Sequence, residues 1–144
     1  MKFISKITIL LILFSSSNTS FAQDTIIEML NKTTTEVMVY SKKIVRINVG
    51  DRVLWKSTDP GHNVEFISGS LPEGVSDFRS NMSKDVEYKF EKPGIYAYQC
   101  TPHKVMGMIG FIVVGNDKSN LDAIKKIKYL GLSKKVAVDL IGQL

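Results

Sequence analysis

Short runs of alternating apolar and polar residues dominate the chain up to residue 114. Val37 and Val39, then Val45, Ile47 and Val49, recur with a period of two residues, as in half-buried β-strands. Turn-forming residues separate these runs from further apolar runs at residues 25–30, 53–55, 86–90, 95–99 and 108–114. Seven or eight short strands at this spacing predict an all-β sandwich or barrel rather than βαβ units.

The pattern becomes helical after Gly115. Ser119, followed three residues later by Asp122, predicts a capped helix start, and Gly131 predicts the end of that helix. Ser133 is the expected N-cap of a second helix. The apolar stripes of the two helices are Leu121, Ile124 and Ile127, then Val136, Ala137, Leu140 and Ile141. We therefore expect a helical extension over residues 117–144, packed on the β-domain.

Residues 1–22 have the layout of a secretory signal peptide. Lys2 and Lys6 flank the start of an apolar run at residues 7–14, and a polar stretch then leads to Ser20-Phe21-Ala22. The run is much shorter than the ~20 residues of a membrane-spanning helix, and no Cys stands at the cleavage site to carry a lipid anchor. We expect cleavage after Ala22 and a mature domain of residues 23–144; the alternative is a buried or amphipathic N-terminal helix.

The composition is that of one globular domain, with 144 residues of which 44% are hydrophobic and 23% charged. It excludes a disordered chain, a coiled coil and a collagen. Without Lys2 and Lys6, 17 basic residues oppose 14 acidic ones, which leaves a net charge of +3. This mild excess favours acidic protein partners and does not predict nucleic-acid binding, which needs a clustered basic face.

The chain has one Cys and two His. An unpaired thiol in an exported protein is a buried inert residue, a nucleophile or a metal ligand. Cys100 lies in a segment, residues 98–108, that also contains His103, Met106 and Met108, at the junction of two predicted strands. His62 lies 38 residues upstream of Cys100, also where a loop meets a strand. A thiolate, two imidazoles and one weakly bound thioether form the ligand set of a trigonal copper site with a long axial Met.

Three other interpretations compete with copper. Structural zinc needs four strong ligands, and the chain has only three Cys or His residues. A catalytic Cys100–His103 pair has no evident orienting group and leaves the methionines unexplained. Separate structural roles, with Cys100 and the methionines in the core and both His on the surface, would make their clustering a coincidence.

The sequence resembles the cupredoxins, and among them the pseudoazurin family, over residues 23–144, helical extension included. The resemblance rests on three motifs: Gly61-His62-Asn63-Val64, Cys100-Thr101-Pro102-His103 and Met106-Gly107-Met108. It implies a plastocyanin-like domain, a Greek-key β-sandwich or barrel with two C-terminal helices. It also implies a periplasmic protein that carries single electrons on one Cu(I)/Cu(II) ion. Such a transient carrier is most simply a monomer, and we expect it not to be an enzyme. The partners that the resemblance implies are nitrite reductase or a similar respiratory protein, and c-type cytochromes, without nucleic acid or a membrane anchor.

Four residues match the copper ligands of that family: His62, Cys100, His103 and Met108. Met106 follows His103 at the three-residue spacing of amicyanin-like proteins, and Met108 at the five-residue spacing of pseudoazurin and plastocyanin. Gly107 and the whole-chain resemblance favour Met108. Further matches are Asn63, whose backbone N–H donates to the thiolate, and residues near the exposed imidazole: Met38, Pro102 and Met106.

The ring edge of His103 is the expected route of electron exchange with a transiently docked partner, while His62 is expected to be buried. Exposed cations would steer an acidic partner, with Lys32, Arg79 and Lys104 as candidates. Lys104 stands where relatives often carry an aromatic residue. A copper chaperone or storage protein is the alternative function. An enzyme such as a copper reductase is disfavoured because both His are already used.

Overall fold

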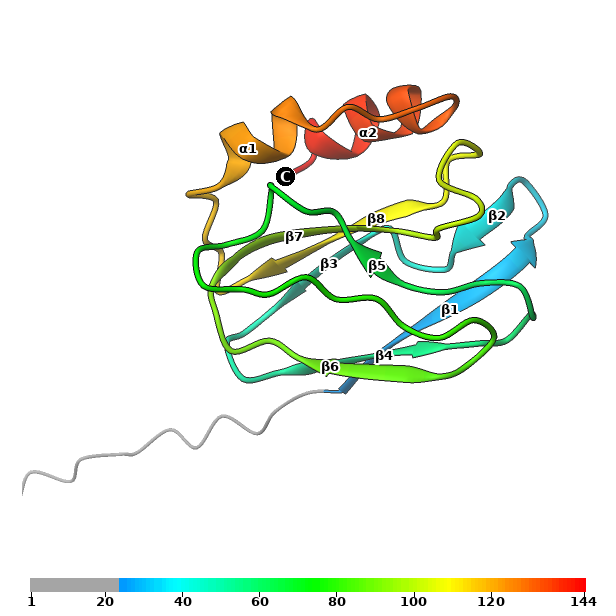
Figure 1. Ribbon diagram of the computed structural model, residues 1–144, viewed down its shortest axis with the longest axis horizontal. Coiled ribbons are helices and arrows are strands. Elements are labelled where there is room, and N and C mark those ends of the chain that lie inside the picture. Colours follow the sequence, from blue (N-terminus) through cyan, green and yellow to red (C-terminus); the bar gives the residue numbers. More distant parts are fainter. Residues whose placement is uncertain (1–23) are drawn as a thin grey trace, which may run out of the picture.

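The computed structural model describes residues 24–144, so the predicted signal peptide, residues 1–22, lies outside the described residues. One sheet has the order β2-β1-β4-β6, from strands β1 (Asp24–Lys32), β2 (Val37–Tyr40), β4 (Arg52–Lys56) and β6 (Val86–Lys89). The other has the order β3-β8-β7-β5, from β3 (Ile44–Ile47), β5 (Glu65–Phe66), β7 (Gly94–Gln99) and β8 (Ile109–Val114). Figure 1 shows the two layers. Over residues 24–144 the sheets stay separate, so the predicted sandwich is confirmed and a closed barrel is not formed.

Each sheet contains one parallel pair of strands. β1 pairs with β4 in parallel, and β3 pairs with β8 in parallel, whereas β1–β2, β4–β6, β5–β7 and β7–β8 are antiparallel. Each parallel pair joins strands that a long connection separates, because a tight hairpin cannot reverse the chain into parallel register. The central position of β7 and β8 matters for function, since the segment between them contains most of the candidate ligands.

The main core lies between the sheets and is rich in aromatic rings. In β3 the alternation predicted from the sequence is confirmed: Val45 and Ile47 are buried, and Arg46 between them is exposed. Val37 and Val49, at the outer ends of the two predicted patterns, are exposed instead. In β4, Val53 and Trp55 are fully buried. The Trp55 ring packs edge-on against Tyr98, with ring centroids 5.3 Å apart, and Tyr98 packs similarly on Tyr40 at 4.8 Å. Such edge-to-face pairs stabilise the packing beyond the area they bury.

Strand β8 is buried at every position, because both faces of its sheet are covered. Its second face packs with the two helices, α1 (Leu121–Lys126) and α2 (Ser133–Ile141). Ile124, Ala137 and Leu140 are the buried residues of the predicted apolar stripes. No helix within residues 24–144 is long and apolar enough to cross a membrane.

The predicted helix ends need correction. The first helix ends at Lys126 rather than Gly131, and its N-cap is Asn120, which makes no side-chain cap hydrogen bond. The Asn120 amide instead accepts from the Ile95 N–H (2.9 Å) and donates to the Ile95 carbonyl (2.7 Å). The predicted capping box of Ser119 is therefore wrong, because bonds to the sheet hold the neighbouring cap residue. Ser133 is the first residue of α2 rather than its cap, and its hydroxyl bonds elsewhere.

Candidate metal centre

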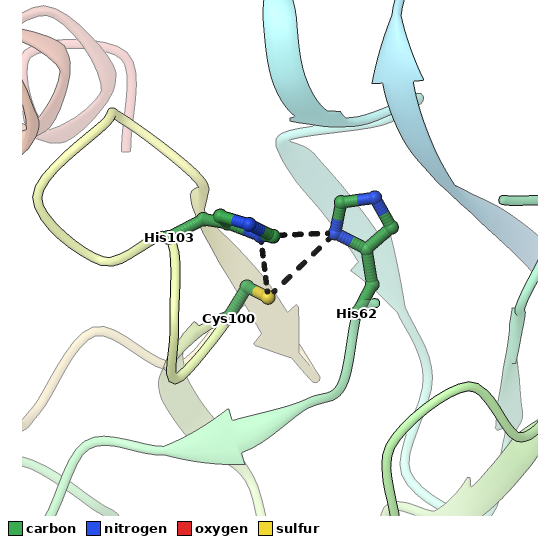
Figure 2. A group of neighbouring side chains, drawn as sticks. All are labelled: His62, Cys100 and His103. Atoms are coloured by element: carbon green, nitrogen blue, oxygen red, sulfur yellow. Dashed lines mark hydrogen bonds between the residues drawn. The ribbon is translucent and has the colours of Figure 1, made fainter. Parts of the chain in front are cut away.

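Three predicted ligand residues converge at one end of the sandwich. His62 lies between β4 and β5, Cys100 directly follows β7, and His103 lies in the turn that leads towards β8. The Cys100 Sγ lies 3.4 Å from His103 Nδ1 and 3.8 Å from His62 Nδ1, and the two Nδ1 atoms are 3.2 Å apart (Figure 2). Cys100 and His62 are fully buried, and His103 is half-buried.

The spacing of these donor atoms fits a single metal ion. Metal–nitrogen and metal–sulfur bonds of about 2.0–2.3 Å, spread at trigonal angles, would place the donors roughly 3.6–3.8 Å apart. The observed separations of 3.2, 3.4 and 3.8 Å lie close to these values. A thiolate and two imidazoles suit copper, whereas a closed structural zinc site needs a fourth strong ligand. No further Cys, His or carboxylate joins this group within the described residues.

His62 is oriented by an amide on β1. Its Nε2 lies 3.0 Å from Asn31 Oδ1, so Nε2 carries the proton and donates it, which leaves the Nδ1 lone pair facing the thiol. Burial lowers the pKa of His62, and the neighbouring His103 adds to the effect, while Asp59 opposes it. Burial also lowers the pKa of His103. Both imidazoles are therefore biased towards the neutral form that binds metal.

A pair of reciprocal hydrogen bonds ties together the two segments that contain the ligands. The Thr101 N–H donates to Asn63 Oδ1 (2.8 Å), and Asn63 Nδ2 donates to Thr101 Oγ1 (2.9 Å). The Thr101 hydroxyl donates in turn to Glu65 (3.1 Å), and the Tyr40 hydroxyl donates to the Asn63 carbonyl (2.8 Å). Since Asn63 follows His62 and Thr101 follows Cys100, these bonds fix the two ligands relative to each other.

The Cys100 thiol is shielded from water. Burial raises its pKa, while the backbone N–H groups of Asn63 and His103, which donate to the sulfur, oppose the rise by stabilising the thiolate. The Asn63 contact is the one that the family resemblance implies. Because a metal binds the thiolate, uptake must release the thiol proton, and affinity therefore rises with pH.

The two candidate axial methionines differ in exposure. Met108 is fully buried and packs in the same core cluster as Cys100, whose N–H donates to the Met108 carbonyl (3.0 Å). The Met106 side chain is 38% exposed. Burial beside Cys100 favours Met108, and its role as a ligand stays a prediction.

Several residues close to His103 in the sequence are apolar. Pro102 is exposed, and Val105 and Met106 keep 46% and 38% of their surface in solvent. Met38 is half-buried and packs against the main core. The predicted steering cations are all exposed: Lys32, Arg79 and Lys104. His103 is therefore followed and preceded in the sequence by exposed apolar residues, and Lys104 beside it is an exposed cation.

Sequence reasoning missed three supporting residues, namely Asn31, Tyr40 and Thr101. Thr101 lies inside the motif Cys100-Thr101-Pro102-His103, so its hydroxyl was a visible candidate for a supporting hydrogen bond. Asn31 and Tyr40 contact the site across 31 and 23 residues of sequence, and no local pattern marks them. Their roles follow from strand pairing, which places β1 and β2 beside the His62 segment.

Comparison with known proteins agrees with this geometry. The profile of the family described as copper binding proteins, plastocyanin/azurin family, matches residues 27–115. A pseudoazurin of Methylorubrum extorquens is 35% identical over 85% of this chain and 83% of its own. A pseudoazurin of Paracoccus pantotrophus is 42% identical over 75% and 74%.

Solved structures agree as well. The crystal structure of pseudoazurin from Methylobacterium extorquens AM1 matches with a TM-score of 0.80 at 35% identity, covering 84% of this chain and 98% of that one. Native pseudoazurin from Hyphomicrobium denitrificans matches with a TM-score of 0.80 at 37% identity, covering 85% and 98%.

The chain belongs to the plastocyanin/azurin family of copper-binding proteins, and the predicted cupredoxin fold is confirmed. Within that family it is a member of the pseudoazurin group. Copper is thus the cofactor that its His62–Cys100–His103 cluster fits, and the chain is a blue copper electron-transfer protein.

Proposed function

We propose that the chain is an exported, periplasmic electron carrier and not an enzyme, with His62, Cys100, His103 and Met108 as its copper ligands. The observation that carries this proposal is the convergence of one buried thiol and two imidazole Nδ1 atoms within 4.8 Å of one another. Copper, when bound, supplies a one-electron Cu(I)/Cu(II) couple. The chain's own residues keep the donors close together, exclude water from Cys100 and His62, and leave one ring half-exposed.

His103 would provide the contact with a redox partner. Its half-buried ring is flanked in the chain by Pro102 and, three residues on, by Met106, both exposed. Apolar contacts of this kind suit a small interface that forms and dissociates quickly. We propose nitrite reductase, a similar respiratory protein or a c-type cytochrome as the partner, and a monomeric carrier. Acidic groups on the partner would approach Lys32, Arg79 and Lys104.

The test is to add Cu(II) to the purified mature protein and to record its visible and electron paramagnetic resonance spectra. An intense thiolate-to-copper charge-transfer band that Cys100→Ser abolishes is the expected result. Met108→Ala should perturb the band more than Met106→Ala, its matched control. A colourless wild type would contradict the proposal. Rapid loss of copper to a chelator would favour a copper chaperone or storage protein instead.

A further inference from the structure

The linker between α1 and α2 contacts the loop that contains His103. Figure 1 shows the linker ending beside the loop that joins β7 to β8. Two consecutive carbonyls of that loop accept hydrogen bonds, one from the last residue of the linker and one from the first residue of α2. The Leu132 N–H donates to the Val105 carbonyl (2.9 Å), and the Ser133 hydroxyl donates to the Lys104 carbonyl (2.6 Å). These carbonyls belong to the first two residues after His103.

The packing around these bonds is tight. Gly131 has φ +55°, and a Cβ at this position would lie 2.3 Å from the Val105 carbonyl oxygen, so even a methyl group would displace the loop. Further along the loop, a Cβ at Gly107 would lie 3.2 Å from Cγ2 of Val136 in α2. The linker and α2 therefore approach the loop at three residues between His103 and Met108, namely Lys104, Val105 and Gly107.

The loop has few restraints of its own between His103 and Met108. The Cys100 N–H bond to the Met108 carbonyl (3.0 Å) closes the base of the loop. Its other internal hydrogen bonds run from the His103 N–H to the Cys100 carbonyl (3.1 Å) and from the Met106 N–H to the His103 carbonyl (2.9 Å). Lys104, Val105 and Met106 are exposed, and exposed turns with few bonds open readily. The contacts from the linker add external restraint where the loop would otherwise move.

The start of α2 is itself buried and fixed to the sheet. Ser133 is only 1% exposed, so its hydroxyl bond is shielded from competing water. In the same helix, Ala137 and Leu140 are buried in the core cluster that includes residues of β7 and β8. The sheet therefore holds α2, and the start of α2 holds the loop.

We propose that the α1–α2 linker and the first residue of α2 form a positioning element for the copper-ligand loop, with Gly131 and Ser133 as its positioning residues. It limits the movement of His103 and Met108 when an electron arrives or leaves. Ligands that move little lower the cost of changing oxidation state, which speeds electron exchange. The redox part of this inference rests on the proposed function, whereas the restraint of the loop does not depend on the metal.

The central variant is Ser133→Ala, with Ser70→Ala as its matched control. Ser70 is also 1% exposed and donates one hydrogen bond to a backbone carbonyl, that of Ile67 (2.8 Å), but it does not bond to the ligand loop. In the metal-free protein, Ser133→Ala should speed hydrogen exchange of the His103 and Met106 amides about fivefold, the effect of one lost hydrogen bond. Exchange in β8 should not change. With copper bound, the rate of electron self-exchange should fall severalfold, and Ser70→Ala should alter neither measurement.

Two further variants, one of them with its own control, keep the test decisive if Ser133→Ala does not fold. Gly131→Ala should loosen or displace the loop, whereas Gly69→Ala, also at positive φ (+79°) but with nothing within 4 Å, should not. Ser133→Thr keeps the hydroxyl and should restore slow amide exchange.

The outcomes separate the two proposals. Loop exchange at the wild-type rate in both Ser133→Ala and Gly131→Ala would overturn the positioning role, even in a protein with a normal blue centre. A wild type without a blue centre would overturn the proposed function, and amide exchange in the metal-free protein would still decide the restraint.

Discussion

Asn63→Ala should destabilise the metal-free protein more than an ordinary polar substitution. Asn63 is fully buried, and its amide accepts from the Thr101 N–H at 2.8 Å and donates to the Thr101 hydroxyl at 2.9 Å. Losing the second bond costs about 1 kcal/mol, and leaving the Thr101 N–H without its acceptor costs about 1–3 kcal/mol. We therefore expect the free energy of unfolding to fall by about 2–4 kcal/mol, a large part of a typical domain's 5–15 kcal/mol.

Urea unfolding of the metal-free protein, followed by circular dichroism, measures this loss. Asn81→Ala, the same substitution at an exposed asparagine, is the matched control and should lose much less than Asn63→Ala. A double-mutant cycle with Thr101→Val isolates the coupling between the two side chains. A loss below about 1 kcal/mol for Asn63→Ala, together with no coupling, would refute the idea that this pair ties the two ligand segments together.

Three further predictions concern the imidazoles and the surface charge. Burial lowers the pKa of His62 and His103 below the usual 6.5, so the unfolded chain binds more protons. The free energy of unfolding of the metal-free protein should therefore be highest above about pH 6.5 and fall as the pH drops below that value. Equal urea midpoints at pH 7.5 and 5.5 would contradict this. Asn31→Ala removes the acceptor of His62 Nε2–H and should weaken copper affinity about 10–100-fold, as measured by competition with a chelator. Asn31→Asp keeps an acceptor and should bind copper with nearly normal affinity. Lys104→Glu should slow electron transfer to an acidic partner severalfold at low salt, an effect that should vanish at high salt; Lys104→Gln should show a smaller effect.

The repeating pattern of the strands was readable from the sequence because one physical cause, burial of alternate residues, produces it. In β3 this alternation is seen directly in the buried Val45 and Ile47, which stand on either side of the exposed Arg46. The ligand cluster could be predicted for a different reason. The chain has one Cys and two His, and these three residues, His62, Cys100 and His103, meet at one site.

The helix caps could not be predicted in the same way. Local rules assign the side chains of Ser119 and Ser133 to helix ends, but the partners that matter are distant in sequence. The Ser133 hydroxyl bonds to Lys104, 29 residues away, and the Asn120 amide bonds to Ile95, 25 residues away. The Asn31–His62 contact has the same cause, since only the pairing of β1 within its sheet brings the two residues together.

Cys100 is the chain's single cysteine and has no solvent-exposed surface. An alkylating reagent can attack its sulfur only after the surrounding structure opens, since the reactive form is an accessible thiolate. In the metal-free protein, the rate at which Cys100 is alkylated therefore measures how often this end of the sandwich opens, and no engineered label is needed. Likewise, two copies can become covalently cross-linked through sulfur only if both have opened, so a disulfide-linked dimer would record past unfolding rather than a native assembly.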